Sequence, residues 1–382
     1  MNNWKKVTLN DIGKIVTGKT PKTKNTEFWN GGIPFVTPAD LQKSKHIFST
    51  ERTVSHIGLN SVKGATLPAG AVCVSCIGNL GYTALTTQKS VSNQQINSII
   101  PNSDFDNDFV YYLMKSLWDE FKNLEGQSTT LSILNKTLFS KIEVLVPEKV
   151  TQQRIAQLLS SLDDKIELNA QINHNLEEQA KAIFKSWFVD FGPFNGKMPK
   201  SWLAKTLADV SKIGAGGDKP HCVSEIQTPE FQYPIYSNGL ANDGLYGYAS
   251  SAKIYEECIT VSARGTIGFV CLRQEPYVPI VRLITLIPNT CFVSAKYLYL
   301  YLKGINISGT GTTQQQLTVP DFQKTSIMVP DNDTMKRFTI CADSIFEQIK
   351  HNAKEMRTLA QLRDTLLPKL MSGEIDVSEV EV

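Results

Sequence analysis

Lysine side chains are concentrated near the start of this 382-residue sequence, in a segment rich in Thr, Gly and Pro. Cations in such a loop suit contacts with phosphate groups of a nucleic acid. The candidates are Lys14, Lys19, Thr20, Lys22 and Lys24, and Phe28 and Trp29 follow a few residues later. The aromatic side chains would anchor the loop or contact a sugar. The alternative is a solvated loop whose aromatic residues belong to the core.

Amide side chains form two further candidate sites. Asn and Gln can form two hydrogen bonds with the edge of adenine in the major groove of duplex DNA, so amides in a loop can recognise sequence. The runs are Asn93-Gln94-Gln95 and Gln314-Gln315-Gln316, with Gln94, Gln95, Gln314 and Gln315 as the expected DNA contacts. Exposed polar loops also accumulate amides, so a solvated role is the alternative.

The net charge hides a local basic excess. The whole chain has 39 Lys and Arg against 37 Asp and Glu, a formal charge of +2 that by itself indicates no nucleic-acid partner. Residues 1–100, however, carry 11 basic and 4 acidic side chains, whereas residues 101–150 carry 5 and 8. The second half of the chain is balanced, and its best basic candidates are Lys253, Arg264 and Arg282.

Catalytic and metal-binding patterns are missing from the sequence. It has no Asp/Asn-Pro-Pro-aromatic motif of adenine methyltransferases, and the loop at 214–219 departs from both nucleotide-binding patterns because Lys219 and Pro220 occupy key positions. Cys73 and Cys76 lack a second ligand pair, and the histidines have no metal-ligand spacing. We therefore expect a non-catalytic protein with no cofactor and no metal.

The sequence repeats one plan twice. Trp4, Leu9, Asp11 and Lys14 recur 198 residues later, and the segment 74–81, which contains Asn79, recurs 187 residues later around Thr266. Leu134, Phe139 and Pro147 recur after 183 residues. The order of the matches is kept, so the second copy is a shorter version of the first. The two amide runs do not align, as expected of two modules that bind different DNA sequences.

Each copy combines two kinds of segment. Short β-branched runs between turn residues predict β-rich modules at 1–150 and 193–333, with helices near 109–124 and 293–302. Long amphipathic helices are expected at 151–192 and 334–376, followed by a tail at 377–382. The predicted fold is α+β, with two β-rich domains joined by two long antiparallel coiled-coil helices in a pseudo-two-fold internal repeat.

Apolar residues recur along both predicted helices at steps of three and four, the spacing of a heptad seam, over about 36 residues. Asn169 and Asn352 occupy equivalent places, where a buried amide costs stability unless a partner bonds to it and fixes the register. The seam residues expected to pair the helices are Leu162, Ile166, Asn169, Leu176, Ile345, Ile349, Asn352 and Leu359. The alternative is that each helix packs separately on its own module.

Antiparallel helices with a module at each end would hold two modules at a fixed separation. That geometry matches duplex DNA, where half-sites on one face recur about every 34–36 Å, although an elongated protein clamp is also compatible with the geometry alone. The odd number of scattered cysteines and the absence of a run of about 18 apolar residues predict a cytoplasmic protein that does not contact membranes.

Several motifs of the sequence resemble the DNA specificity subunit of type I restriction-modification systems, over nearly the whole chain. They lie in the same order as in that family. They are Thr17-Gly18-Lys19-Thr20-Pro21, Gly32-Ile33-Pro34-Phe35-Val36, Asp40-Leu41, Gly126-Gln127-Ser128-Thr129, Gln153-Arg154-Ile155, Phe184-Lys185-Ser186-Trp187-Phe188, Leu366-Leu367 and Ser372-Gly373-Glu374-Ile375.

The resemblance implies two target-recognition domains, each binding half of a bipartite sequence of double-stranded DNA. It also implies that the helical spacers dock methyltransferase (modification) subunits, two in number, and that restriction/translocase subunits complete the complex. Gln152-Gln153 and Met335-Lys336 depart from the family's Glu-Gln, so a shared role for that dipeptide is in doubt. A scaffold that binds modification subunits without directing them to DNA is the alternative function.

Overall fold

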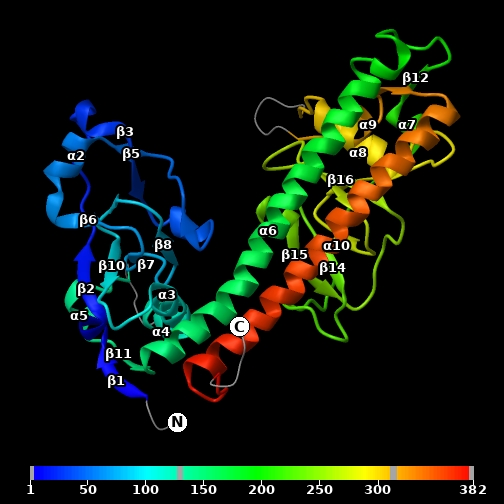
Figure 1. The fold of residues 1–382 in the computed structure, drawn as a ribbon. Coiled ribbons are helices and arrows are strands. Elements are labelled where there is room, and N and C mark those ends of the chain that lie inside the picture. Colours follow the sequence, from blue (N-terminus) through cyan, green and yellow to red (C-terminus); the bar gives the residue numbers. More distant parts are fainter. Residues whose placement is uncertain (1–3, 127–131, 310–315, 378–382) are drawn as a thin grey trace. The chain divides into compact units, whose positions relative to one another are not determined.

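The computed structural model describes residues 4–126, 132–309 and 316–377 (Figure 1). The chain forms two compact units, one made of residues 1–169 and 354–382 (unit 1) and one of residues 170–353 (unit 2). Each unit combines a β-rich module with part of two 40-residue helices, α6 (Lys149–Phe188) and α10 (Asn332–Met371). α10 continues through Pro368 near its C-terminal end.

The module of unit 1 is built on a five-stranded sheet in the order β2-β10-β7-β8-β4. Its neighbours are antiparallel except for the pair of β4 and β8. These strands are β2 (Gly13–Thr17), β10 (Ile96–Pro101), β7 (Val72–Ser75), β8 (Thr83–Thr86) and β4 (His46–Ile47). A four-stranded sheet contains β5 (Thr53–Val54), β3 (Trp29–Val36), β9 (Ser90–Ser92) and β6 (Thr66–Leu67), and β1 (Lys5–Thr8) pairs with β11 (Glu143–Val146).

The helices of this module are short. They are α1 (Leu9–Ile12), α2 (His56–Ser61), α3 (Asn107–Ser116), α4 (Trp118–Gly126) and α5 (Lys136–Ser140). The helix expected near 109–124 is therefore two helices, α3 and α4, separated at Leu117.

Unit 2 repeats this arrangement with a smaller set of strands. A four-stranded antiparallel sheet has the order β13 (Ser211–Ala215), β19 (Ile284–Pro288), β16 (Cys258–Val261) and β17 (Val270–Arg273). A three-stranded sheet contains β15 (Leu245–Ala249), β14 (Tyr233–Tyr236) and β18 (Val278–Pro279), and β12 (Leu203–Thr206) pairs with β20 (Ser326–Val329). The helices are α7 (Leu207–Val210), α8 (Ala295–Gly304) and α9 (Val319–Phe322).

The internal repeat is confirmed down to single hydrogen bonds. Thr8 and Asp11 form a reciprocal cap at the start of α1, and Thr206 and Asp209 form the same cap on α7. The amide of Leu9 donates to the carbonyl of Ile142, and that of Leu207 donates to the carbonyl of Thr325. These pairs keep the offsets of the sequence matches.

One apolar core in each unit joins the module to both long helices. In unit 1, Ile155 and Leu159 of α6 and Leu370 of α10 belong to the same buried cluster as Phe109 of α3. In unit 2, Phe184 of α6 and Phe338 of α10 belong to one cluster with Tyr297 of α8. The long helices thus pair with each other and also pack on a module, so the alternative of separate packing is wrong.

A buried lysine in each unit ties the module to a long helix. Lys45 pairs with Asp108, the second residue of α3, at 2.5 Å and donates to Ser160 of α6 at 2.7 Å. Lys296, the second residue of α8, pairs with Glu257 at 2.7 Å and with Asp343 of α10 at 2.9 Å. Burial by itself would lower the pKa of Lys296, but the two carboxylates outweigh burial and raise it.

The two lysines contact the same position of the repeated long helix, because Ser160 and Asp343 are 183 residues apart, the offset of the repeat. The charges are exchanged, however. In unit 1 the carboxylate, Asp108, lies on the module helix α3 and Lys45 lies on a loop. In unit 2 Lys296 lies on the equivalent module helix, α8, and the carboxylate of Glu257 lies on a loop. The long helix therefore supplies a hydroxyl to Lys45 in unit 1 and a carboxylate to Lys296 in unit 2.

We predict that Lys296→Met lowers the free energy of unfolding by about 2 kcal/mol, because it leaves two partly buried carboxylates without their cation. Urea unfolding of the full chain measures the change. Lys324→Met is the matched control, since Lys324 is 74% exposed in its ion pair with Asp321 and should cost less than about 0.5 kcal/mol. Equal losses for both variants would contradict the assignment.

Candidate nucleic-acid interface

Four strand ends of the large sheet in unit 1 lie on one side of it. β2 and β7 end there, and β8 and β10 begin there, because neighbouring strands are antiparallel. The turns at 18–25, 76–82 and 93–95 therefore meet. We call this end of the strands, with the three turns that lie there, loop edge 1.

Hydrogen bonds hold these turns together. The Thr20 hydroxyl donates to the Gln94 side-chain oxygen at 2.7 Å, and the Cys76 amide donates to the Gln95 carbonyl at 2.7 Å. Gly18 passes so close to Asn93 that a Cβ atom would lie 2.0 Å from its carbonyl oxygen. The structure thus brings the predicted lysine, amide and Asn79 segments to one edge.

The predicted cations at loop edge 1 face solvent. The side chains of Lys19, Lys22 and Lys24 are exposed, as are Asn79 and Gln94, and Thr20 and Gln95 are half-buried. Asn93 donates to the Gln95 side-chain oxygen at 2.9 Å and so orients that amide.

The aromatic residue after the lysines has an anchoring role. Trp29 packs edge-on against Phe35 with 5.1 Å between ring centroids, and the Arg52 guanidinium lies 3.8 Å above the Trp29 ring. Sequence reasoning missed Arg52, because no pattern in the sequence predicts that it stacks on a tryptophan 23 positions earlier. Its side chain is exposed and adds a further cation to the module.

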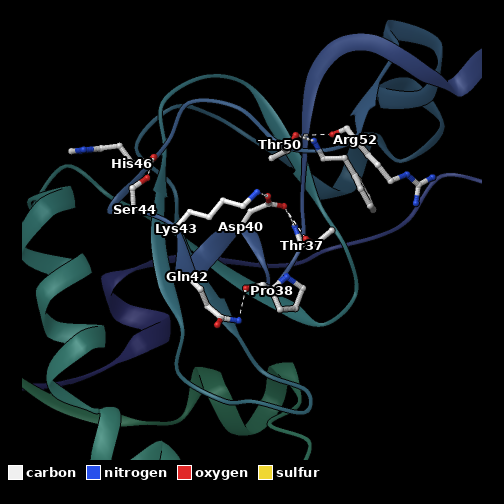
Figure 2. A network of polar contacts seen from close by, with 10 residues as sticks. Thr37, Pro38, Asp40, Gln42, Lys43, Ser44, His46, Thr50 and Arg52 are labelled. Atoms are coloured by element: carbon white, nitrogen blue, oxygen red, sulfur yellow. Dashed lines mark hydrogen bonds and ion pairs between the residues drawn. The ribbon is translucent and has the colours of Figure 1, made fainter. Parts of the chain in front are cut away.

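A buried carboxylate fixes the turn after β3. Asp40 is 4% exposed and accepts hydrogen bonds from the amide and hydroxyl of Thr37 at 2.9 and 2.8 Å (Figure 2). Lys43 pairs with the same carboxylate at 2.8 Å, and this hydrogen bond and charge raise the pKa of Lys43. Figure 2 shows the Arg52 guanidinium directed away from this cluster.

Loop edge 2 is the equivalent side of the large sheet in unit 2. β13 and β16 end there, and β17 and β19 begin there. The amide of Gly216 donates to the Leu283 carbonyl, as Gly18 donates to Ile96. The amide of Leu317 donates to the Ala263 carbonyl, as Leu134 donates to Cys76.

The predicted residues Arg264, Thr266 and Arg282 are exposed at loop edge 2. Arg282 and the preceding Val281 both have left-handed backbones, with φ of 59° and 53°. Their amides donate to the carbonyls of Gly216 and Gly217 at 2.9 Å, which holds this strained turn in place. Gln314 and Gln315 lie outside the described residues.

Asn238 clamps two turns of loop edge 2. Its side-chain nitrogen donates to the Val281 carbonyl at 2.7 Å, and its oxygen accepts from the Ala263 amide at 2.7 Å. Sequence reasoning missed Asn238. The Ser237-Asn238-Gly239 turn signal could have drawn attention to it.

The long helices run antiparallel in each unit. In unit 1, Asp163 pairs with Arg363 at 2.6 Å, and the buried Asn169 donates to the Glu355 carboxylate at 2.7 Å. In unit 2, the buried Asn352 donates to the Asn173 side-chain oxygen at 2.8 Å. The remaining seam candidates are half-buried, namely Leu162, Ile166, Leu176, Ile345, Ile349 and Leu359.

Asn169 and Asn352 occupy equivalent positions but donate hydrogen bonds to different side chains, because the residues opposite them differ between the two helices. The residue equivalent to Asn173 in the second helix is Met356, which cannot accept a strong hydrogen bond. Asn169 bonds instead to Glu355, one position earlier.

Within the described residues, His, Cys, Asp and Glu side chains form no group of three or more that could hold a metal ion. Over the same residues, no helix is both long and apolar enough to cross a membrane.

Known proteins share both the sequence pattern and the fold. Residues 1–178 and 199–355 match the family model described as the type I restriction modification DNA specificity domain. The MjaIX specificity subunit of Methanocaldococcus jannaschii is 29% identical over 99% of this chain and 95% of that protein. The HindI specificity subunit of Haemophilus influenzae is 34% identical over 46% of this chain and 39% of that protein.

A solved structure agrees at the level of the fold. The type I restriction-modification S subunit from M. genitalium superposes with a TM-score of 0.60 and 17% identity, covering 97% of this chain and 96% of that chain.

The repeated modules on paired helices, with cationic and amide-bearing loop edges, define a DNA-recognition scaffold. The chain belongs to the type I restriction-modification DNA specificity family. This membership confirms the predicted resemblance and the prediction of a specificity subunit in place of an enzyme.

We predict that Asn352→Ala lowers the free energy of unfolding by about 1–3 kcal/mol, because it removes a buried amide and leaves the half-buried side chain of Asn173 without this partner. Urea unfolding of the full chain measures the loss. Asn175→Ala, at an exposed position of α6, is the control and should change stability by less than about 0.5 kcal/mol. A harmless Asn352→Ala would show that the amide pair does not stabilise the helix pairing.

Proposed function

We propose that the two modules are target-recognition domains, and that each binds one half of a bipartite DNA sequence through its loop edge. The observation that carries this proposal is the equivalence of the two edges. The same backbone hydrogen bonds hold turns at the same strand ends, while the exposed side chains on those turns differ. Such edges suit two different half-sites.

The lysines of loop edge 1 contribute mainly sequence-independent affinity. Lys19, Lys22 and Lys24 are exposed on one turn beside the amides, so phosphate contacts would position the amides near base edges. The amides and the basic residues of loop edge 2 then supply selectivity.

The paired helices act as the spacer between half-sites and as the docking surface for two modification subunits, and restriction/translocase subunits join the complex. The exposed apolar side chains on the long helices support a docking role, with Ile340 74% and Leu168 49% exposed. We place the complex in the cytoplasm. A scaffold that binds modification subunits without directing them to DNA is the competing function.

We predict that the triple variant with Lys19, Lys22 and Lys24 changed to Ala binds all DNA sequences more weakly. Each lost phosphate contact should reduce the slope of log affinity against log salt by about 0.9. Titration of labelled duplex at several salt concentrations measures both quantities.

The matched control changes Lys5, Lys6 and Lys141 to Ala. These lysines are exposed in the same module but lie on or beside the β1–β11 pair, at the other end of β2. They should leave the slope unchanged. If the wild-type complex shows no preference among DNA sequences, the scaffold function is correct and the recognition function is wrong.

We predict that one heptad inserted after residue 169 and another after residue 353 widens the gap between half-sites. Both insertions are needed because the helices are antiparallel, and seven residues add about 10 Å, or about three base pairs. Mapping methylated adenines in cells that express the variant with its modification subunit gives both half-sites and their gap.

The control inserts seven residues after Lys197, in the exposed connection that follows α6. It should leave the gap unchanged. Altered half-sites in the helix variant would contradict the division between recognition modules and spacer.

A further inference from the structure

The hydrogen bonds shared by the two loop edges allow their side chains to be compared position by position. Ile96 and Leu283 accept equivalent bonds, and so do Cys76 and Ala263. It follows that Gln94 and Gln95 are equivalent to Val281 and Arg282. Ile77 is likewise equivalent to Arg264, and Ile133 to Gln316.

The last two pairs differ completely in chemistry. In unit 1, Ile77 and Ile133 face each other across an isolated antiparallel bridge, and Ile133 is 57% exposed. In unit 2, the Arg264 guanidinium lies 3.5 Å from the side-chain oxygen of Gln316, which orients it. Arg264 and Gln316 also line an open cavity of about 700 Å³ together with Ile267 and Ile307.

The exposed apolar surface of an isoleucine gains stability when an apolar group of a binding partner covers it. In the major groove of DNA, the apolar group of the bases is the thymine methyl. An arginine fixed by one side-chain acceptor keeps other N–H groups free to donate to O6 and N7 of guanine, the commonest specific contact to that base.

We propose that these two equivalent positions select bases. Ile77 and Ile133 contact a thymine methyl in the half-site bound by unit 1, and Arg264, oriented by Gln316, binds a guanine in the half-site bound by unit 2. This inference rests on the proposed function, because it assigns bases to edges that must first bind DNA.

The framework of the edges supports this assignment. The turn that carries Ile77 is held by the Ser75 hydroxyl, which donates to the Asn79 carbonyl at 2.7 Å and accepts from the Tyr82 amide at 2.9 Å. Ser262 makes the same two bonds, to Thr266 and Phe269, beside Arg264. The backbone is therefore constant and the presented side chain is the variable part.

The experiment uses the full chain purified with its modification subunits and a library of random duplexes. Wild type should select a bipartite sequence, and failure to select any sequence would overturn the proposed function itself. Duplexes carrying the selected sequence are then modified one base at a time.

Replacing one thymine by uracil in the unit 1 half-site should weaken wild-type binding about fourfold, because it removes a single buried methyl group. Ile133→Ala should reduce this difference, and the double variant with Ile77→Ala and Ile133→Ala should bind the thymine and uracil duplexes equally. Leu145→Ala is the control, since Leu145 is 51% exposed on β11, away from loop edge 1, and should keep the fourfold difference.

Replacing one guanine by 7-deazaguanine in the unit 2 half-site should weaken wild-type binding about tenfold, because N7 is lost as an acceptor. Arg264→Ala should be indifferent to this replacement, and Lys212→Ala, on the exposed side of β13, should remain sensitive. Folding defects would weaken all duplexes equally and leave these differences in place. The inference would be overturned if wild type selects a bipartite site but the double isoleucine variant still distinguishes thymine from uracil and Arg264→Ala still distinguishes guanine from 7-deazaguanine.

Discussion

The pairing of α6 with α10 is the interaction on which the rest of the structure depends. Each helix has 40 residues, and a seam of that length exceeds what one small module could cover. The partner helix covers it in each unit, and the core of each module closes over both helices. Because Leu370 shares a core with Phe109, the N-terminal module is completed by residues from the far end of the chain. Neither module is a self-contained segment of sequence.

Polar groups within this apolar pairing determine which surfaces meet. Asn169 and Asn352 are buried and each is bonded to a side chain of the opposite helix, which penalises a shifted register. Lys45 and Lys296 act similarly between module and helix, with exchanged charges at one repeated position. Lys296 placed against the other helix segment would meet Ser160 in place of Asp343, and would lose that carboxylate while remaining buried. The two halves of a duplicated protein are thereby kept distinct, so each module stays on its own segment.

The features that could be predicted from sequence are those that appear twice in the chain or follow a regular residue spacing. The repeat, the long helices and the buried amides follow from collinear matches and heptad spacing. What could not be predicted depends on contacts between distant residues, such as Arg52 stacking on Trp29 or Asn238 bridging two turns. The amide runs at 93–95 and 314–316 do not align in the sequence, and the hydrogen bonds show that Arg282 occupies the position equivalent to Gln95. Sequence identity at loops carries too little information to establish that equivalence.

Under the proposed function, the backbone hydrogen bonds that the two loop edges share would let one fold carry two different recognition surfaces. Gly18 and Gly216 have no room for a side chain, because a Cβ atom there would collide with the adjoining backbone. Ile77, Gln95, Arg264 and Arg282 lie on neighbouring turns of the two loop edges, are not fully buried, and contribute little to the core. We expect substitution at these positions to cost little stability and, under the proposed function, to change which base the protein contacts. The backbone of each loop edge would then provide stability, and its exposed side chains would provide selectivity.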